Sequence, residues 1–115
     1  MDGRTQLPVI EWMKREHKAD YVDTITEPGP VRILAEATDA AAVESIKRRV
    51  DISVKKHGSS HVAIVAHADC AGNPVDREAQ LRQLRAAAAT VLAWGLGVRL
   101  DLLWLGDNWQ VERIG

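Results

Sequence analysis

The stretch that decides the fold is His61–Gly72, which reads HVAIVAHADCAG. Its first half is a continuous apolar run containing two valines and one isoleucine. Such a run is typical of a strand that is buried on both faces, as strands of parallel sheets are. Its second half has the composition of a loop. The sequence therefore predicts a buried strand at His61–Ala66 that leads directly into a polar loop holding the single cysteine, Cys70.

Helix and strand patterns alternate on both sides of this strand. The expected helices are Leu7–His17, a short helical turn at Pro30–Ala37, Ala40–His57, and Pro74–Trp94 with Asn73 as its cap. The other expected strands are Tyr21–Thr26, Val98–Leu105 and Trp109–Ile114. Strands separated by helices indicate an α/β fold, here a three-layer, mostly parallel β-sheet with helices on both faces. Ligands bind at the carboxyl ends of the strands in such sheets.

The composition predicts one small domain with no particular attraction to nucleic acid or membranes. A chain of 115 residues suits a single domain. Its 15 basic and 16 acidic residues give a net charge of −1, so no basic surface for nucleic acid is expected. No apolar run is long enough to span a bilayer, and no secretory signal opens the chain. Because one cysteine cannot form an internal disulfide, we expect a reduced, cytoplasmic setting.

His67 and Cys70 are the candidate metal ligands. They form an H-x-x-C pair directly after the buried strand, and imidazole and thiolate are ligand types that zinc prefers. Two protein ligands do not hold zinc tightly, so a third must come from elsewhere in space. An alternative interpretation remains open, in which a loop histidine lies beside a half-buried cysteine packed as a small apolar residue.

The other polar residues near this pair are weaker candidates. His17 and His57 end helices, where an imidazole complements the helix dipole, and His61 begins a strand. All three are expected at the surface. Asp69 lies between the two candidate ligands, and we expect it to shape the loop as a turn acceptor.

Two motifs in the expected order resemble those of the β-class carbonic anhydrases. Asp2-Gly3-Arg4 precedes the first helix, and His67 to Cys70 follows the buried strand. That family carries C-x-D-x-R after its first strand and H-x-x-C after its third. The segments MDGR, EPGP and HADCAGNP look like those of a small, divergent branch. The resemblance implies that Asp2 and Arg4 are the catalytic pair.

The chain departs from the family pattern at its start. The family's first zinc-binding cysteine would stand immediately before Met1. The strand that delivers it is expected in the middle of the sheet, between Tyr21–Thr26 and His61–Ala66. We therefore expect a single domain over residues 1–115 that is truncated at its N-terminus. Either the start is assigned to an internal methionine of a longer C-M-D-G-R, or the sheet is rearranged or completed by another chain.

The resemblance implies reversible hydration of carbon dioxide by zinc-bound hydroxide, with Asp2 orienting the water and Arg4 keeping Asp2 ionised. With only two ligands, zinc binding and activity are expected to be weak or absent, so whether this chain is an enzyme stays open. If active, it is a zinc-dependent lyase with carbon dioxide and bicarbonate as partners.

Two other functions are considered. One is a metal-free, non-catalytic domain of the same fold that acts in self-association or small-anion binding. The other, a weaker candidate, is a thiol enzyme with Cys70 as nucleophile and His67 as base. Family members are dimers or multiples of dimers, and Trp12 on the first helix offers apolar area for contact. We therefore expect a homodimer.

Overall fold

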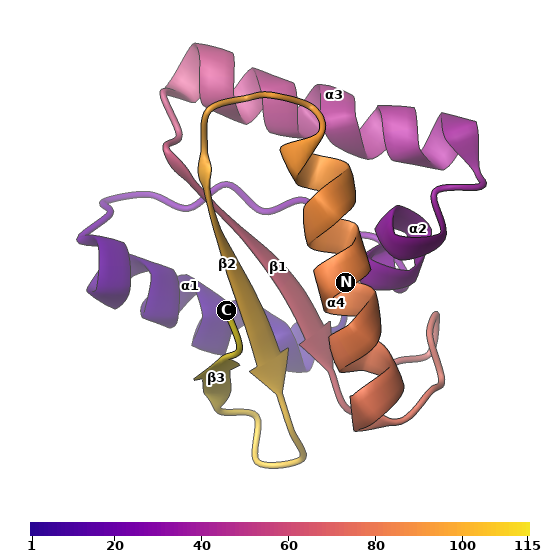
Figure 1. Ribbon diagram of the computed structural model, residues 1–115. Helices are drawn as coiled ribbons and strands as arrows, with labels where there is room; N and C mark the ends of the chain where they lie inside the picture. The colour runs from indigo at the N-terminus through magenta and orange to yellow at the C-terminus, as the bar shows by residue number, and fades with distance from the viewer.

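The computed structural model describes all residues from Met1 to Gly115 (Figure 1). The elements in chain order are α1 (Gly3–His17), α2 (Pro30–Glu36), α3 (Ala40–His57), β1 (His61–His67), α4 (Arg77–Leu92), β2 (Arg99–Leu105) and β3 (Val111–Arg113). The expected α/β class is confirmed. None of the four helices combines the length and the apolar character that crossing a membrane requires.

The sheet is small and mixed. Its strand order is β1-β2-β3, so β2 is central and β1 has one unpaired edge. β1 pairs with β2 in parallel, with Ile64 opposite Leu102, whereas β3 runs antiparallel to β2. The long apolar runs of β1 and β2 are the reason that these two strands form the buried centre.

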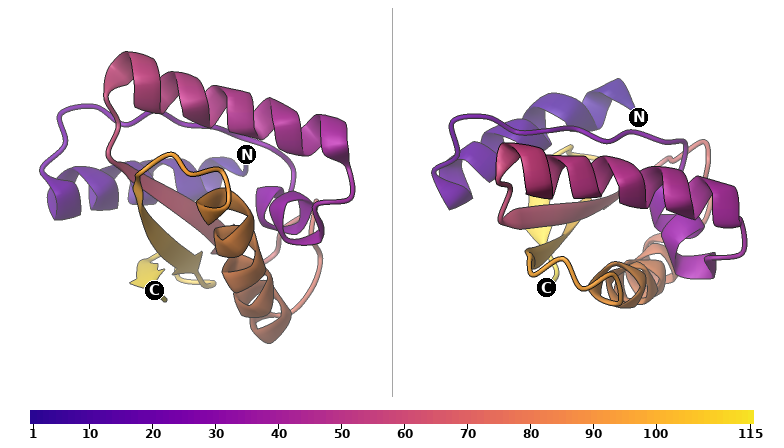
Figure 2. Two further views of the ribbon diagram at one scale, coloured as in Figure 1. Left: turned by 45° about the horizontal axis from the view of Figure 1, so that its top comes forward. Right: turned by 90° about the horizontal axis from the view of Figure 1, so that it is seen from above.

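Helices cover both faces of this sheet (Figure 2). Leu103 of β2 packs with Trp12 and Met13 of α1. Its neighbour Leu102 packs in a separate core cluster with Leu84 of α4. Because successive side chains of a strand point to opposite faces, α1 and α4 must lie on opposite sides of β2. The buried side chains of α2 and α3 join the same cluster as α4.

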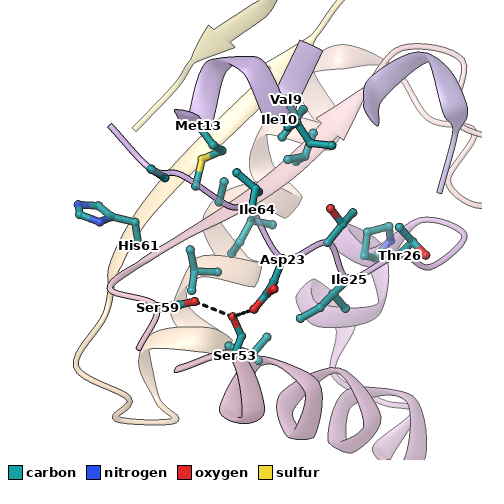
Figure 3. Close-up of a pocket in the computed structure, with 18 of the residues that line it drawn as sticks. Val9, Ile10, Met13, Asp23, Ile25, Thr26, Ser53, Ser59, His61 and Ile64 are labelled. Carbon is teal, nitrogen blue, oxygen red and sulfur yellow. Dashed lines mark hydrogen bonds between the residues drawn. The ribbon is translucent and has the colours of Figure 1, made fainter. Parts of the chain in front are cut away.

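The predicted strand at Tyr21–Thr26 is wrong. The segment is extended but belongs to no sheet, and residues 19–26 make no backbone hydrogen bond to any other backbone group. A strand requires a partner, and the free edge of β1 lies across a groove from this segment. That edge and residues 19–26 are opposite walls of the groove, which has a volume of about 1000 Å³ (Figure 3). The central strand of the resembled family would lie at this position.

Two helix starts also differ from the prediction. α1 begins at Gly3 rather than Leu7, because the side chain of Asp2 caps it by accepting a hydrogen bond from the Arg4 N–H. α4 begins at Arg77, with Asp76 as its cap, accepting from the Ala79 N–H at 2.9 Å. The side chain of Asn73, the expected cap, forms a hydrogen bond with Gln83 instead.

Asn73 is nearly fully buried and donates to the Gln83 side chain at 2.5 Å. α4 ends at Leu92, two residues before the predicted end. The bounds of α3 are confirmed. Its cap Asp39 accepts from the Ala42 N–H at 3.1 Å, and Gly58 ends it with φ +70°.

Candidate metal and active site

Asp2 and Arg4 form a compact ion pair at the start of α1. The guanidinium donates to both carboxylate oxygens, with Nη2–Oδ2 at 2.7 Å and Nε–Oδ1 at 3.1 Å. The Arg4 backbone N–H adds a third hydrogen bond at 2.9 Å. The Arg4 side chain and then its backbone N–H hold the pKa of Asp2 far below its usual range. Asp2 is therefore ionised at neutral pH and accepts hydrogen bonds only.

Arg4 is held by two further groups that come from distant parts of the chain. Its Nη2 lies 3.3 Å from Oδ2 of Asp69, in the loop after β1. Its guanidinium carbon lies 4.2 Å from the ring centre of Trp109, in the loop between β2 and β3. The Asp2 carboxylate first, and then that of Asp69, raise the pKa of Arg4 above its ordinary value. The arginine thus links the start of α1 to the ends of two strands.

His67 is the last residue of β1 and is buried. Its Nδ1 lies 2.7 Å from the Ala68 carbonyl oxygen, so this nitrogen carries the proton and donates. Nε2 is then the nitrogen with the free lone pair, which is the state that a metal-ligating histidine takes. Gln80 of α4 fixes the backbone here by donating to the His67 carbonyl at 2.8 Å. The ring centre of His67 lies 5.9 Å from that of Trp109.

Cys70 is a buried free thiol in the loop after β1. Its carbonyl accepts from the Asn73 N–H at 3.2 Å, which tightens the loop. The backbone of Gly72 packs directly on the Pro28–Gly29 turn, so that a Cβ at Gly72 would lie 2.5 Å from the Pro28 carbonyl carbon. Only glycine fits there. The two loops that flank the site are therefore in backbone contact.

The two candidate ligands suit zinc in type, but they do not complete a site. No group of three or more His, Cys, Asp or Glu side chains is arranged to hold a metal ion. Asp2 is the acidic residue of the first motif, yet both of its oxygens already accept hydrogen bonds from Arg4. A closed tetrahedral site needs four ligands and a catalytic one needs three from the protein. Residues 1–115 offer His67 and Cys70 as candidates, and no group of three is arranged with them.

Comparison with protein families identifies the family of the chain. Residues 1–115 match the model of the family described as "Putative carbonic anhydrase". The chain belongs to this carbonic anhydrase family. No curated protein and no solved structure matches it. The family membership inferred from x-D-x-R and H-x-x-C is thereby confirmed, whereas no comparison tests the roles of the individual residues.

Two residues of this carbonic anhydrase family member were missed as contributors to the site. Asp69 was expected only to shape its loop, and it also pairs with Arg4. Trp109 was expected only as the start of a short strand, and it lies over Arg4 and beside His67. Its φ of +55° is unusual for a bulky residue and costs about 1–3 kcal/mol. The signal in the sequence was its place in the loop after a parallel strand.

Proposed function

We propose that the chain is a carbonic anhydrase-like zinc protein for the reversible hydration of carbon dioxide. His67 and Cys70 are its zinc ligands, and Asp2 and Arg4 are its catalytic pair. The observation that carries the proposal is the joining of the Asp2–Arg4 pair to the loop of His67 and Cys70 through Asp69. Zinc held at this loop supplies the Lewis acidity that activates water at neutral pH.

The chain's own residues have distinct roles in this reaction. Asp2, kept ionised by Arg4, accepts a hydrogen bond from the reacting water and so directs its lone pair at carbon dioxide. Arg4 holds the carboxylate with a two-pronged contact that fixes its orientation. Trp109 covers Arg4 and limits its motion. In the neutral ring of His67, Nδ1–H donates to the Ala68 carbonyl, so Nε2 is the nitrogen that offers a lone pair to a metal.

We propose that the third ligand comes from outside residues 1–115, because no group of three or more His, Cys, Asp or Glu side chains here is arranged to hold a metal ion. The motif puts a cysteine directly before Met1. A strand ahead of Met1 would enter the groove beside β1, because Met1 lines this groove and its nitrogen donates to the Glu27 carbonyl at 3.1 Å. We propose that a strand in this groove completes a three-layer fold with a mostly parallel sheet and helices on both faces.

The test compares three proteins in equilibrium dialysis against zinc and in stopped-flow hydration of carbon dioxide. They are the 115-residue chain, the chain preceded by a six-residue Val/Ile/Ala segment ending in cysteine, and the same extension ending in serine. We expect weak, substoichiometric zinc and little activity in the first and third. The second should bind about one zinc ion and gain activity. Equal zinc and equal rates in all three proteins would contradict the proposed ligand set.

The lack of a group of three or more arranged metal ligands also favours a second candidate function, that of a metal-free, non-catalytic domain of the same fold. This domain would act in self-association or small-anion binding. It predicts that none of the three proteins hydrates carbon dioxide. We further propose a cytoplasmic homodimer, in keeping with the reduced thiol of Cys70. Light scattering at micromolar concentration should give twice the mass of the chain, and a monomer would refute this.

A further inference from the structure

The loop that follows β1 is held by two glutamines of α4. Gln80 and Gln83 are close to one turn apart and therefore lie on the same side of the helix. The loop covers residues 68–76 and contains Cys70. In Figure 1 it leaves the end of β1, extends toward α2 and returns to the first turn of α4. Both glutamines form hydrogen bonds with residues in or directly beside this loop.

Gln80 joins the two ends of the loop. Its Nε2 donates to the carbonyl of His67, the residue directly before the loop, at 2.8 Å. The same nitrogen lies 3.4 Å from the carbonyl oxygen of Val75, near the other end of the loop. Gln80 is 1% exposed, so its amide is shielded from solvent. One buried amide group therefore fixes how far apart the two ends of the loop lie.

Gln83 binds the part of the loop that is next to Cys70. Asn73 donates from Nδ2 to Oε1 of Gln83 at 2.5 Å, and Nε2 of Gln83 lies 3.5 Å from Oδ1 of Asn73. The two side-chain amides are thus paired in both directions. The Asn73 backbone N–H donates to the Cys70 carbonyl at 3.2 Å. Gln83 therefore reaches the backbone of Cys70 through a single intervening residue.

The burial of Asn73 makes this pair more than a packing contact. Asn73 is 1% exposed, and a buried amide costs free energy unless its polar atoms are hydrogen-bonded. Gln83 is the side chain that satisfies it. Helix capping does not explain Asn73, because Asp76 caps α4. A buried and fully paired amide instead holds the backbone around it in one arrangement.

We propose that the side chains of Gln80, Gln83 and Asn73 form an amide clamp that positions the two candidate metal ligands. Gln80 holds the backbone at His67. Gln83 holds the backbone at Cys70 through Asn73. All three are positioning residues, because they act on the backbone of the loop and not on the thiol or the imidazole. The use of the two ligands for a metal rests on the proposed function, whereas the holding of the loop does not.

The test measures how fast Cys70 of the 115-residue chain reacts with an aromatic disulfide reagent at a fixed pH. The thiol is buried, so it reacts when the loop opens. Gln83→Met keeps the length of the side chain but leaves the buried Asn73 amide without its partner. Opening returns this amide to water, so the reaction should be at least about tenfold faster. Gln83→Glu keeps an acceptor for Asn73 and should stay within about threefold of the parent.

Thr90→Val is the matched control on the same helix. Thr90 donates from Oγ1 to the Leu34 carbonyl at 2.7 Å, which joins α4 to α2 and not to the loop. This substitution also removes a hydrogen bond from α4, yet it should change the reaction rate of Cys70 less than about threefold. Equal acceleration by Gln83→Met and Thr90→Val would mean that Cys70 reacts only through global unfolding, and would overturn the proposal. An unchanged rate in Gln83→Met would also overturn it.

Cobalt(II) gives a spectroscopic readout in the chain that carries the Val/Ile/Ala extension ending in cysteine. The absorbance of the thiolate–cobalt bond reports binding at Cys70. Gln83→Met should weaken cobalt binding at least about tenfold, and Gln83→Glu should restore it, because groups that orient a ligand affect metal affinity. Equal affinity in Gln83→Met and its parent would overturn the positioning role. An extended parent that binds no cobalt would contradict the proposed function, and the reaction rates of Cys70 would then decide the clamp alone.

Discussion

The buried contact between Gln80 and the His67 carbonyl gives the sharpest prediction for stability. The side chain of Gln80 is about 1% exposed and donates from Nε2 to this carbonyl at 2.8 Å. Gln80→Met keeps the length of the side chain but leaves the carbonyl without its donor. Losing one partner of a buried hydrogen bond costs about 1–3 kcal/mol. Burying a thioether instead of an amide recovers part of this cost, so we expect a net loss of about 1–2 kcal/mol.

This loss can be measured by thermal and urea unfolding followed by circular dichroism. A 115-residue chain has an unfolding entropy of about 240 cal/mol/K at about 2.1 cal/mol/K per residue. The melting temperature should therefore fall by about 4–8 °C. Arg85→Met, at an exposed position of the same helix, should stay within about 0.5 kcal/mol of the parent. An unchanged melting temperature for Gln80→Met would refute the reasoning, since the His67 carbonyl would then have another donor.

Three further predictions use the same unfolding assay. Leu84→Ala should destabilise the chain by about 2–5 kcal/mol, because Leu84 is fully buried in the larger core cluster; a loss below about 1 kcal/mol would mean that the cluster is loosely packed. Ala37→Gly should raise the free energy of unfolding by roughly 0.5 kcal/mol and so raise the urea midpoint, because Ala37 ends α2 with φ +52°, where a Cβ is unfavourable. A lower midpoint would contradict this. Asp2 has a lowered pKa in the folded chain, so its contribution is complete above its unfolded pKa of about 3.9 and is lost as the pH falls through the folded value. Asp2→Asn should therefore destabilise the chain at pH 7 and have a smaller effect at pH 2, and an equal effect at both would refute the ionic account.

Local signals predicted the parts of the fold that depend on neighbouring residues. The apolar run HVAIVA predicted β1, and the helical pattern of Ala40–His57 predicted both ends of α3. The prediction of a strand at Tyr21–Thr26 was wrong, because a segment forms a strand only where another strand lies beside it to share backbone hydrogen bonds. The prediction of where α4 begins was wrong, because Asn73 and Asp76 are both residues that commonly cap helices. Only the fold shows that Gln83 takes the side chain of Asn73.

In the candidate site too, local motifs predicted some residues, whereas contacts between distant residues were not predicted. Asp2 caps a helix and meets Arg4 two residues later, so a short motif was enough to find this pair. His67 lies at the carboxyl end of its strand, as the pattern of a buried run followed by a polar loop predicted. Trp109 and the pairing of Asp69 with Arg4 join residues far apart in sequence, and no local pattern marks such contacts.

The close approach of Gly72 to the Pro28–Gly29 turn has a consequence for the order of folding. Neither loop can take its final shape until the other is present, because their backbones are in contact. The contact closes a long stretch of chain, and long-range contacts of this kind tend to form after the local ones. A bulkier residue at Gly72 should therefore speed unfolding more than it slows folding. The loop of His67 and Cys70 would be among the last parts of the chain to fold and the first to unfold.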